Sequence, residues 1–157
     1  MLKFSEESTR IKYIDISEEA FVCDPSAPAS EIAKAMVDHW IDTIFVVNKQ
    51  EELLGVITDG IMLSLIAKKR KISDELTAEK LMVTPVYSVM GNEHVHSYEK
   101  LKKTFSKRHS RVNRVAIIDE NGKLIGSLNM GFLKKIGRYS RTYDITLKKK
   151  DGTDSNE

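Results

Sequence analysis

Two short stretches place polar side chains directly after an apolar run that contains a glycine. In LLGVITDGIML the run is followed by Thr58 and Asp59, and in KLIGSLNMGFL it is followed by Asn129. A hydroxyl, a carboxylate and an amide at such points can bind the polar groups of a ligand. The same side chains can instead cap the N-terminus of a following helix, which requires no ligand. The residues themselves are compatible with both interpretations.

The elements that must position Thr58 and Asp59 are predicted by periodicity. ASEIAKAMVDHW places Ile32, Met36 and Trp40 four residues apart, which indicates the apolar stripe of an amphipathic helix. TIFVVN and LLGVIT flank the polar turn KQEE and predict a hairpin. DGIMLSLIAKKRK predicts a second helix, with Thr58 or Asp59 as its N-cap and basic residues at its end.

The second half of the chain repeats this order. SYEKLKKTFSKRH carries Tyr98, Leu101 and Phe105 at helical spacing, and RVAIID and KLIGSLN flank the turn ENG. MGFLKKIG then predicts a short helix that ends at Gly137. Because AFVCDPSAP and TPVYSVM add an extended piece to each half, both halves read strand, helix, strand, strand, helix.

Composition indicates an ordinary globular protein. The 157 residues are 41% hydrophobic and 31% charged, with a formal net charge of +2, so we expect one compact domain or two small ones with a shared core. No apolar run approaches the roughly 20 residues that span a bilayer, and MLKFSEESTR lacks the apolar core of a signal peptide. Since a single cysteine, Cys23, suits a reducing compartment, we predict a cytoplasmic protein without membrane contact.

The ordered repeat resembles a tandem pair of CBS domains, the Bateman module named after cystathionine β-synthase. The resemblance rests on AKAMVDHWIDTIFVVN and LLGVITDG in the first half, and on LMVTPVYSV and VAIIDENGKLIGSLN in the second. It implies an α/β (α+β) fold in which two β-α-β-β-α motifs pack sheet to sheet as a pseudo-twofold pair. The expected divisions are an N-terminal segment (1–13), a first motif (14–74), a second motif (75–137) and a C-terminal tail (138–157), part of which we expect to be disordered.

The resemblance also implies a regulatory role without catalysis. Members of the family bind AMP, ADP, ATP or S-adenosylmethionine in clefts between the motifs, transmit binding by conformational change, and often form dimers. Nucleotide-binding motifs carry an Asp three residues after the Ser or Thr, and both groups contact the ribose. This chain has Ile61 and Phe132 at the two positions of that Asp, and it has Asn129 where the second hydroxyl belongs.

Alignment to the family identifies candidate ligand-binding residues at the strand ends and in the extended pieces. Arg114 is notable because a guanidinium can hold a phosphate in a bidentate pair. We expect Cys23 to be a small buried side chain and not a reactive thiol. The candidates are Thr58, Asp59, Asp42, Thr43, Val22, Cys23, Tyr87, Val89, Asn113, Arg114 and Asn129.

Four functions stay open at this point. The first motif can bind an adenine nucleotide, with Asp59 or a residue of the other motif in place of the missing acid. The module can bind another ligand, or it can serve as a ligand-free homodimer or scaffold. Seven basic residues between Lys100 and Arg114 also allow nucleic-acid binding. The solvated face of a helix is the favoured explanation for them, and a net charge of +2 argues against nucleic-acid binding. We expect neither a metal site at His94 and His96 nor a catalytic constellation.

Overall fold

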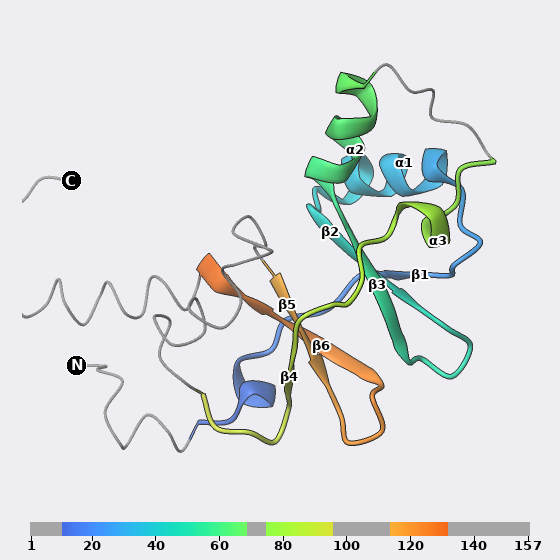
Figure 1. Cartoon of the computed structure of the whole chain (residues 1–157). Helices are drawn as coiled ribbons and strands as arrows, with labels where there is room; N and C mark the ends of the chain where they lie inside the picture. The colour runs from blue at the N-terminus through green and yellow to red at the C-terminus, as the bar shows by residue number, and fades with distance from the viewer. Residues whose placement is uncertain (1–10, 69–74, 96–113, 132–157) are drawn as a thin grey trace, which may run out of the picture.

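Two three-stranded sheets form the centre of the molecule (Figure 1). The computed structural model describes residues 11–68, 75–95 and 114–131. The described helices α1, α2 and α3 gather on the first sheet. In chain order the elements are η2 (Tyr13–Ile16, a 3-10 turn), β1 (Val22–Cys23), α1 (Ala29–His39), β2 (Thr43–Val47), β3 (Leu53–Thr58), α2 (Asp59–Ala67), α3 (Ala78–Leu81), β4 (Ser88–Met90), β5 (Arg114–Ile118) and β6 (Leu124–Asn129).

The two sheets have the same topology, which confirms the internal repeat. In the first sheet β1 is parallel to β2, and β2 is antiparallel to β3. The second sheet repeats this with β4, β5 and β6. Val46 pairs with Gly55 in the first hairpin, and Ile117 pairs with Gly126 in the second, so the two glycines occupy the same register position.

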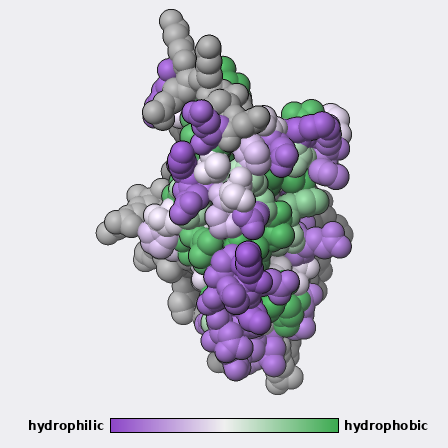
Figure 2. Space-filling model, turned by 90° about the vertical axis from the view of Figure 1, so that its right-hand side faces the viewer, coloured by the Kyte–Doolittle hydropathy of each residue, from purple (hydrophilic) through white to green (hydrophobic). Residues whose placement is uncertain are grey.

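The sheets pack against each other, as the α/β (α+β) class with paired motifs predicts. Phe45 and Val56 of the first sheet form a buried cluster with Ala116 of the second. The two hairpins also lie side by side, because Leu53 N donates to Gly122 O at 3.3 Å and Leu124 N donates to Glu51 O at 3.0 Å. Figure 2 shows hydrophilic surface at the height of these hairpin turns and hydrophobic surface higher on the same face.

Each repeat begins with a leading segment that packs on the other repeat; Ser17 and Glu18 belong to the leading segment of the first repeat, and Met82 and Val83 to that of the second. Glu18 and Ser127 exchange two backbone hydrogen bonds of 2.8 and 3.0 Å, which ties the leading segment of the first repeat to β6. Val83 and Val56 exchange two bonds of 2.9 and 3.2 Å, which ties the leading segment of the second repeat to β3. Contacts therefore cross the expected division between residues 74 and 75 in both directions, and the division itself stays a prediction.

Where the first repeat is described, between residues 11 and 68, the predicted helices and hairpin are present and one residue is misplaced. Ile32 and Met36 are buried on the inner face of α1, as their spacing predicts. Trp40 was expected on the same stripe, and this was wrong: its side chain is 95% exposed. The reason is that α1 ends at His39, and Trp40 takes a left-handed conformation with φ of 54°. That turn directs the side chain away from the core.

Part of the second repeat falls outside the described residues. The helix expected around Tyr98, Leu101 and Phe105 lies there, as do Phe132 and the tail. The last expected helix is described only at its beginning, where Met130 and Gly131 are helical. Within the described ranges, none of the helices has the length and apolarity required to cross a membrane.

The two paired glycines permit the close crossing of these leading segments. A Cβ on Gly55 would lie 2.4 Å from Met82 Sδ and 2.7 Å from Met82 Cβ. A Cβ on Gly126 would lie 3.0 Å from Ser17 Cβ and 3.2 Å from the carbonyl oxygen of Glu18. Met82 and Ser17 belong to the leading segments. A methyl group at Gly55 would therefore displace Met82, and one at Gly126 would require Ser17 and Glu18 to shift by a few tenths of an ångström.

We predict that Gly55→Ala lowers the free energy of unfolding by about 1–3 kcal/mol, because Met82 and its backbone must move to admit the methyl group. Gly60→Ala is the matched control, since the nearest atom to its Cβ would be Thr58 Oγ1 at 3.7 Å. An alanine inside a helix should leave stability unchanged or raise it by up to about 1 kcal/mol. Chemical denaturation of both variants checks this, and equal stability of the two would contradict the crossing constraint.

Candidate functional site

A cavity of about 730 Å³ lies beside α2, where β2 begins and β3 ends. Its wall is shared between the two repeats, because residues of the segment leading into the second repeat line it together with strands and helix of the first. A cavity of this size is in the range that holds a small-molecule ligand. The polar residues that line it are Asp42, Thr43, Thr58, Asp59, Ser64, Lys68 and Lys80, and Ile61, Leu65, Leu81 and Val83 supply apolar surface.

Thr58 and Asp59 lie in this cavity and also organise the start of α2. Thr58 is the N-cap, and its Oγ1 accepts from the backbone N–H of Ile61 at 3.4 Å. Asp59 Oδ1 accepts from the N–H of Gly60 at 2.8 Å. The capping role predicted for Thr58 is therefore confirmed, and it coexists with exposure to the cavity. Capping and ligand contact are not alternatives at this position.

Asp42 enters the cavity from the turn between α1 and β2, and Thr43 enters it from the first position of β2. Thr43 Oγ1 donates to Asp42 Oδ1 at 2.9 Å, and the backbone carbonyl of Asp42 accepts from the N–H of Asp59 at 3.0 Å. The second bond joins this turn to the first residue of α2. Four of the sequence candidates, Asp42, Thr43, Thr58 and Asp59, are thus brought together around one cavity.

Arg114 connects the two repeats through its side chain. Its Nε donates to Asp42 Oδ1 at 3.3 Å, and an Nη donates to Glu18 Oε2 at 3.3 Å. The guanidinium lines a second cavity, of about 390 Å³, which shares Thr43 with the first cavity. Arg114 therefore lies between the two cavities and already has two carboxylate partners within the chain.

The position of the family's ribose acid is apolar in this structure. Ile61 lines the cavity and packs against the core of the first repeat. In the second repeat, Asn129 Oδ1 accepts from the N–H of Gly131 at 2.8 Å, so the amide serves the start of the following helix. Asn113 and Phe132 fall outside the described residues.

The candidates from the extended pieces lie elsewhere in the described structure. Val22 is exposed on β1, and Tyr87 and Val89 pack in the core of the second repeat. Cys23 packs against the first core, and burial, with the nearby charge of Asp24, raises its pKa to about 11. Its thiol stays protonated at neutral pH, which fits the structural role predicted for it. None of these four lines the 730 Å³ cavity.

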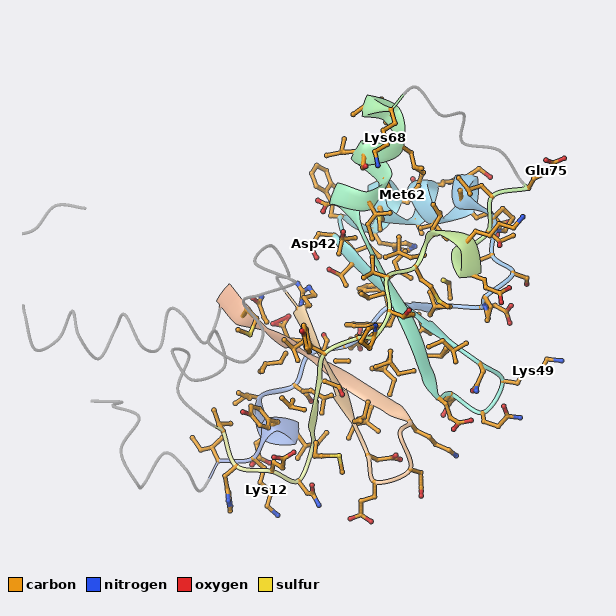
Figure 3. The ribbon with its side chains drawn as sticks, viewed as in Figure 1. Lys12, Asp42, Lys49, Met62, Lys68 and Glu75 are labelled. Atoms are coloured by element: carbon orange, nitrogen blue, oxygen red, sulfur yellow. The ribbon has the colours of Figure 1, made fainter. Side chains whose placement is uncertain are left out.

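Sequence reasoning missed the residues that close the cavity from the other side. Lys80 and Val83 belong to the segment leading into the second repeat, and Lys68 was interpreted only as the basic end of a helix. Figure 3 shows Lys68 near the far end of α2 and Asp42 near the strand ends. Gly55 was the available signal, since a glycine within a strand can mark close approach of another backbone.

The histidine pair His94 and His96 and the basic stretch from Lys100 to Arg114 are only partly covered by the described residues. His94 is described and pairs across an isolated bridge with Lys12, whereas His96 is outside the described residues. Among residues 11–68, 75–95 and 114–131, no three His, Cys, Asp or Glu side chains gather as metal ligands would. Except for Arg114, the basic stretch from Lys100 to Arg114 is not described.

Comparisons with known proteins agree with the fold and the repeat. The family model for the CBS domain matches residues 11–68. An uncharacterized protein of Methanopyrus kandleri is 32% identical over 115 residues, which is 73% of this chain and 56% of that protein. This chain therefore spans little more than half the length of that relative.

Solved structures of low sequence identity share the fold. A CBS domain protein from Pyrobaculum aerophilum complexed with AMP has a TM-score of 0.63 and 15% identity, and the match covers 77% of this chain and 88% of that one. The CBS domain pair of the protein MJ0100, in complex with 5′-methylthioadenosine and S-adenosyl-L-methionine, has a TM-score of 0.67 and 19% identity, with 83% and 98% covered. Two repeats of one topology, paired sheet to sheet, and the match over residues 11–68 together identify the chain as a CBS-domain protein with the fold of a CBS-domain pair.

Proposed function

We propose that the chain is a regulatory module that binds an adenosine-containing ligand, AMP, ADP, ATP or S-adenosylmethionine, in the 730 Å³ cavity. The observation that carries this proposal is the cavity itself, which brings Thr58, Asp59 and Asp42 together beneath the segment leading into the second repeat. Structural relatives complexed with AMP, and with 5′-methylthioadenosine and S-adenosyl-L-methionine, support the ligand class. The role is regulatory and not catalytic, and the single Cys23 favours a cytoplasmic location.

Asp42 and Asp59 are the side chains that can replace the missing ribose acid. Both carboxylates line the same cavity as Thr58, and the backbone bond from Asp59 N to Asp42 O holds them at neighbouring positions. A carboxylate that accepts from ribose hydroxyls makes a charge-assisted bond, which contributes about 1.5–3 kcal/mol. Ile61 then supplies an apolar contact to the ligand instead of a polar one.

The cavity is also placed to transmit binding between the repeats. Val83 lines it and is hydrogen-bonded to Val56 of β3, while Asp42 lines it and is hydrogen-bonded to Arg114 of β5. A ligand that contacts Val83 or Asp42 differently in two arrangements of the repeats would favour one arrangement. Binding and relative orientation of the repeats are coupled in this way.

We predict that at least one of AMP, ADP, ATP and S-adenosylmethionine raises the melting temperature saturably, because a ligand that binds only the folded chain stabilises it. Thr58→Ala should abolish most of that rise, and Thr58→Ser, which keeps the hydroxyl, should retain it. Since Thr58→Ala also loses an N-cap worth about 1 kcal/mol, each shift is measured against the same variant without ligand. A lack of any shift at millimolar concentration would contradict adenosine binding.

A second candidate function, homodimerisation, is favoured by apolar side chains in solvent on α1, on its C-cap Trp40 and on α2. Val37 is 74% exposed, Trp40 95%, Leu63 62% and Ile66 61%. Met62 and Leu65 on the opposite side of α2 are buried, so this helix is apolar on both sides, as helices covered on both sides are. We propose that a second copy of the chain covers this surface.

The charges beside this surface fit a second copy. Lys34 and Asp38 form an ion pair on α1, next to Val37. In a twofold contact the same patch meets itself, and Lys34 of one copy can face Asp38 of the other. An isologous contact over this patch would bring together both the apolar and the charged side chains of the two copies.

We predict that Leu63→Glu converts a dimer into a monomer, because the contact would then bury two unpaired carboxylates. Val22→Glu is the control, since it adds the same charge to an exposed apolar position on β1. Sedimentation equilibrium of the wild type and both variants measures this. A monomeric wild type, or a dimer that persists in Leu63→Glu, would contradict the proposed surface.

A further inference from the structure

The charged groups of the 730 Å³ cavity are separated along α2. The carboxylates of Asp42 and Asp59 lie at the N-terminal end of this helix, and Lys68 is its C-cap. At 1.5 Å per residue, the backbones of Asp59 and Lys68 are roughly 13 Å apart along the helix axis. Figure 3 shows Asp42 and Lys68 toward opposite ends of α2. The cavity therefore has an acidic end and a basic end.

The acidic end is closed to an anion. A helix N-terminus commonly binds phosphate through free backbone N–H groups. Here the N–H of Asp59 donates to Asp42 O, that of Gly60 donates to Asp59 Oδ1, and that of Ile61 donates to Thr58 Oγ1. Two carboxylates beside these occupied donors would also repel a phosphate. This end accepts hydrogen bonds, so it suits hydroxyl or amino groups of a ligand.

Arg114 does not reverse the charge at this end. Its guanidinium is held by Asp42 at 3.3 Å and by Glu18 at 3.3 Å. The carboxylates of Asp42 and Glu18 neutralise the guanidinium, and a phosphate that binds Arg114 would have to displace at least one of these two carboxylates. The bidentate contact with phosphate that the sequence suggested for Arg114 would therefore require the loss of a contact between the repeats.

The basic end of the cavity offers the ammonium group of Lys68 as a hydrogen-bond donor. Lys80 Nζ donates to the carbonyl oxygen of Glu75 at 3.1 Å. Lys68 has no hydrogen bond or ion pair from its side chain to any residue in the described part of the chain, and it lines the cavity. An ammonium group with no acceptor among the described residues is available to an anionic group of the ligand.

We propose that Lys68 is the residue that selects the charge of the ligand. This inference rests on the proposed adenosine-binding function and adds an orientation to it. The ribose hydroxyls donate to the carboxylates of Asp42 and Asp59, and the anionic group, a phosphate or a carboxylate, extends along α2 to Lys68. The ligand class is thus an adenosine compound with an anionic group that reaches away from the N-terminus of α2.

The test compares adenosine, which has no anionic group, with AMP and S-adenosylmethionine by isothermal titration calorimetry on the full chain. We expect the wild type to bind AMP more tightly than adenosine. Lys68→Gln should weaken the binding of AMP by about fivefold without changing that of adenosine. Lys49→Gln removes the same charge at a hairpin turn outside the cavity, as Figure 3 shows, and should change neither. A parallel loss for S-adenosylmethionine in Lys68→Gln would identify carboxylate as well as phosphate binding.

Asp59→Asn tests the other end of the cavity. The amide keeps the oxygen that accepts from Gly60 but loses the charge, so adenosine and AMP should both bind more weakly by a similar factor. If Asp59→Asn bound AMP more tightly than the wild type while its affinity for adenosine did not rise, the phosphate would lie at the N-terminus of α2, and the inference would be overturned. Equal affinities of the wild type and Lys68→Gln for AMP would also overturn the inference about Lys68, while the proposed adenosine-binding function would still stand. Failure of every compound to bind would overturn both.

Discussion

The crossing of each repeat's leading segment over a strand of the other repeat is the constraint on which the rest of the structure depends. Gly55 and Gly126 permit the close crossing, because a side chain at Gly55 would collide with Met82 and one at Gly126 would crowd Ser17 and Glu18. The backbone bonds of Val83 to Val56 and of Glu18 to Ser127 then fix the segments in place. Each repeat is therefore hydrogen-bonded to the leading segment of the other.

The cavity is a consequence of that exchange. The segment that crosses β3 continues from Lys80 to Val83, and these residues close the space beside α2. The same arrangement places Asp42 of the first repeat within hydrogen-bond distance of Arg114 on β5. Residues that could contact a ligand are therefore also residues that hold the repeats together. Under the proposed function, this overlap would let a small molecule alter the relative position of the two halves.

Much of the fold could be predicted from the sequence, because the relevant signals are local. Apolar periodicity gave α1 and both hairpins, and Thr58 was identified as a cap from its position before an apolar helix. Trp40 was misplaced because periodicity does not report where a helix ends. The family resemblance brought Asp42, Thr43, Thr58 and Asp59 to one site, and their shared cavity agrees with that grouping.

What could not be predicted depends on contacts between distant residues. Lys80 and Val83 reach the cavity only through the crossing over Gly55, and no local pattern shows which strand a linker will cross. The carboxylate partners of Arg114 come from two separate segments, so its neutralisation is visible only in three dimensions. The separation of charge along α2 likewise depends on where Asp42 and Lys68 lie relative to one cavity.

The central claim is that a ligand in the cavity contacts both repeats at once. The most direct measurement is an amide chemical-shift titration by NMR with AMP and with adenosine. The account predicts shifts that saturate together at Thr58 and Asp59 in the first repeat and at Leu81 and Val83 in the segment leading into the second. Shifts confined to one repeat, or centred on the hairpin turns, would contradict it.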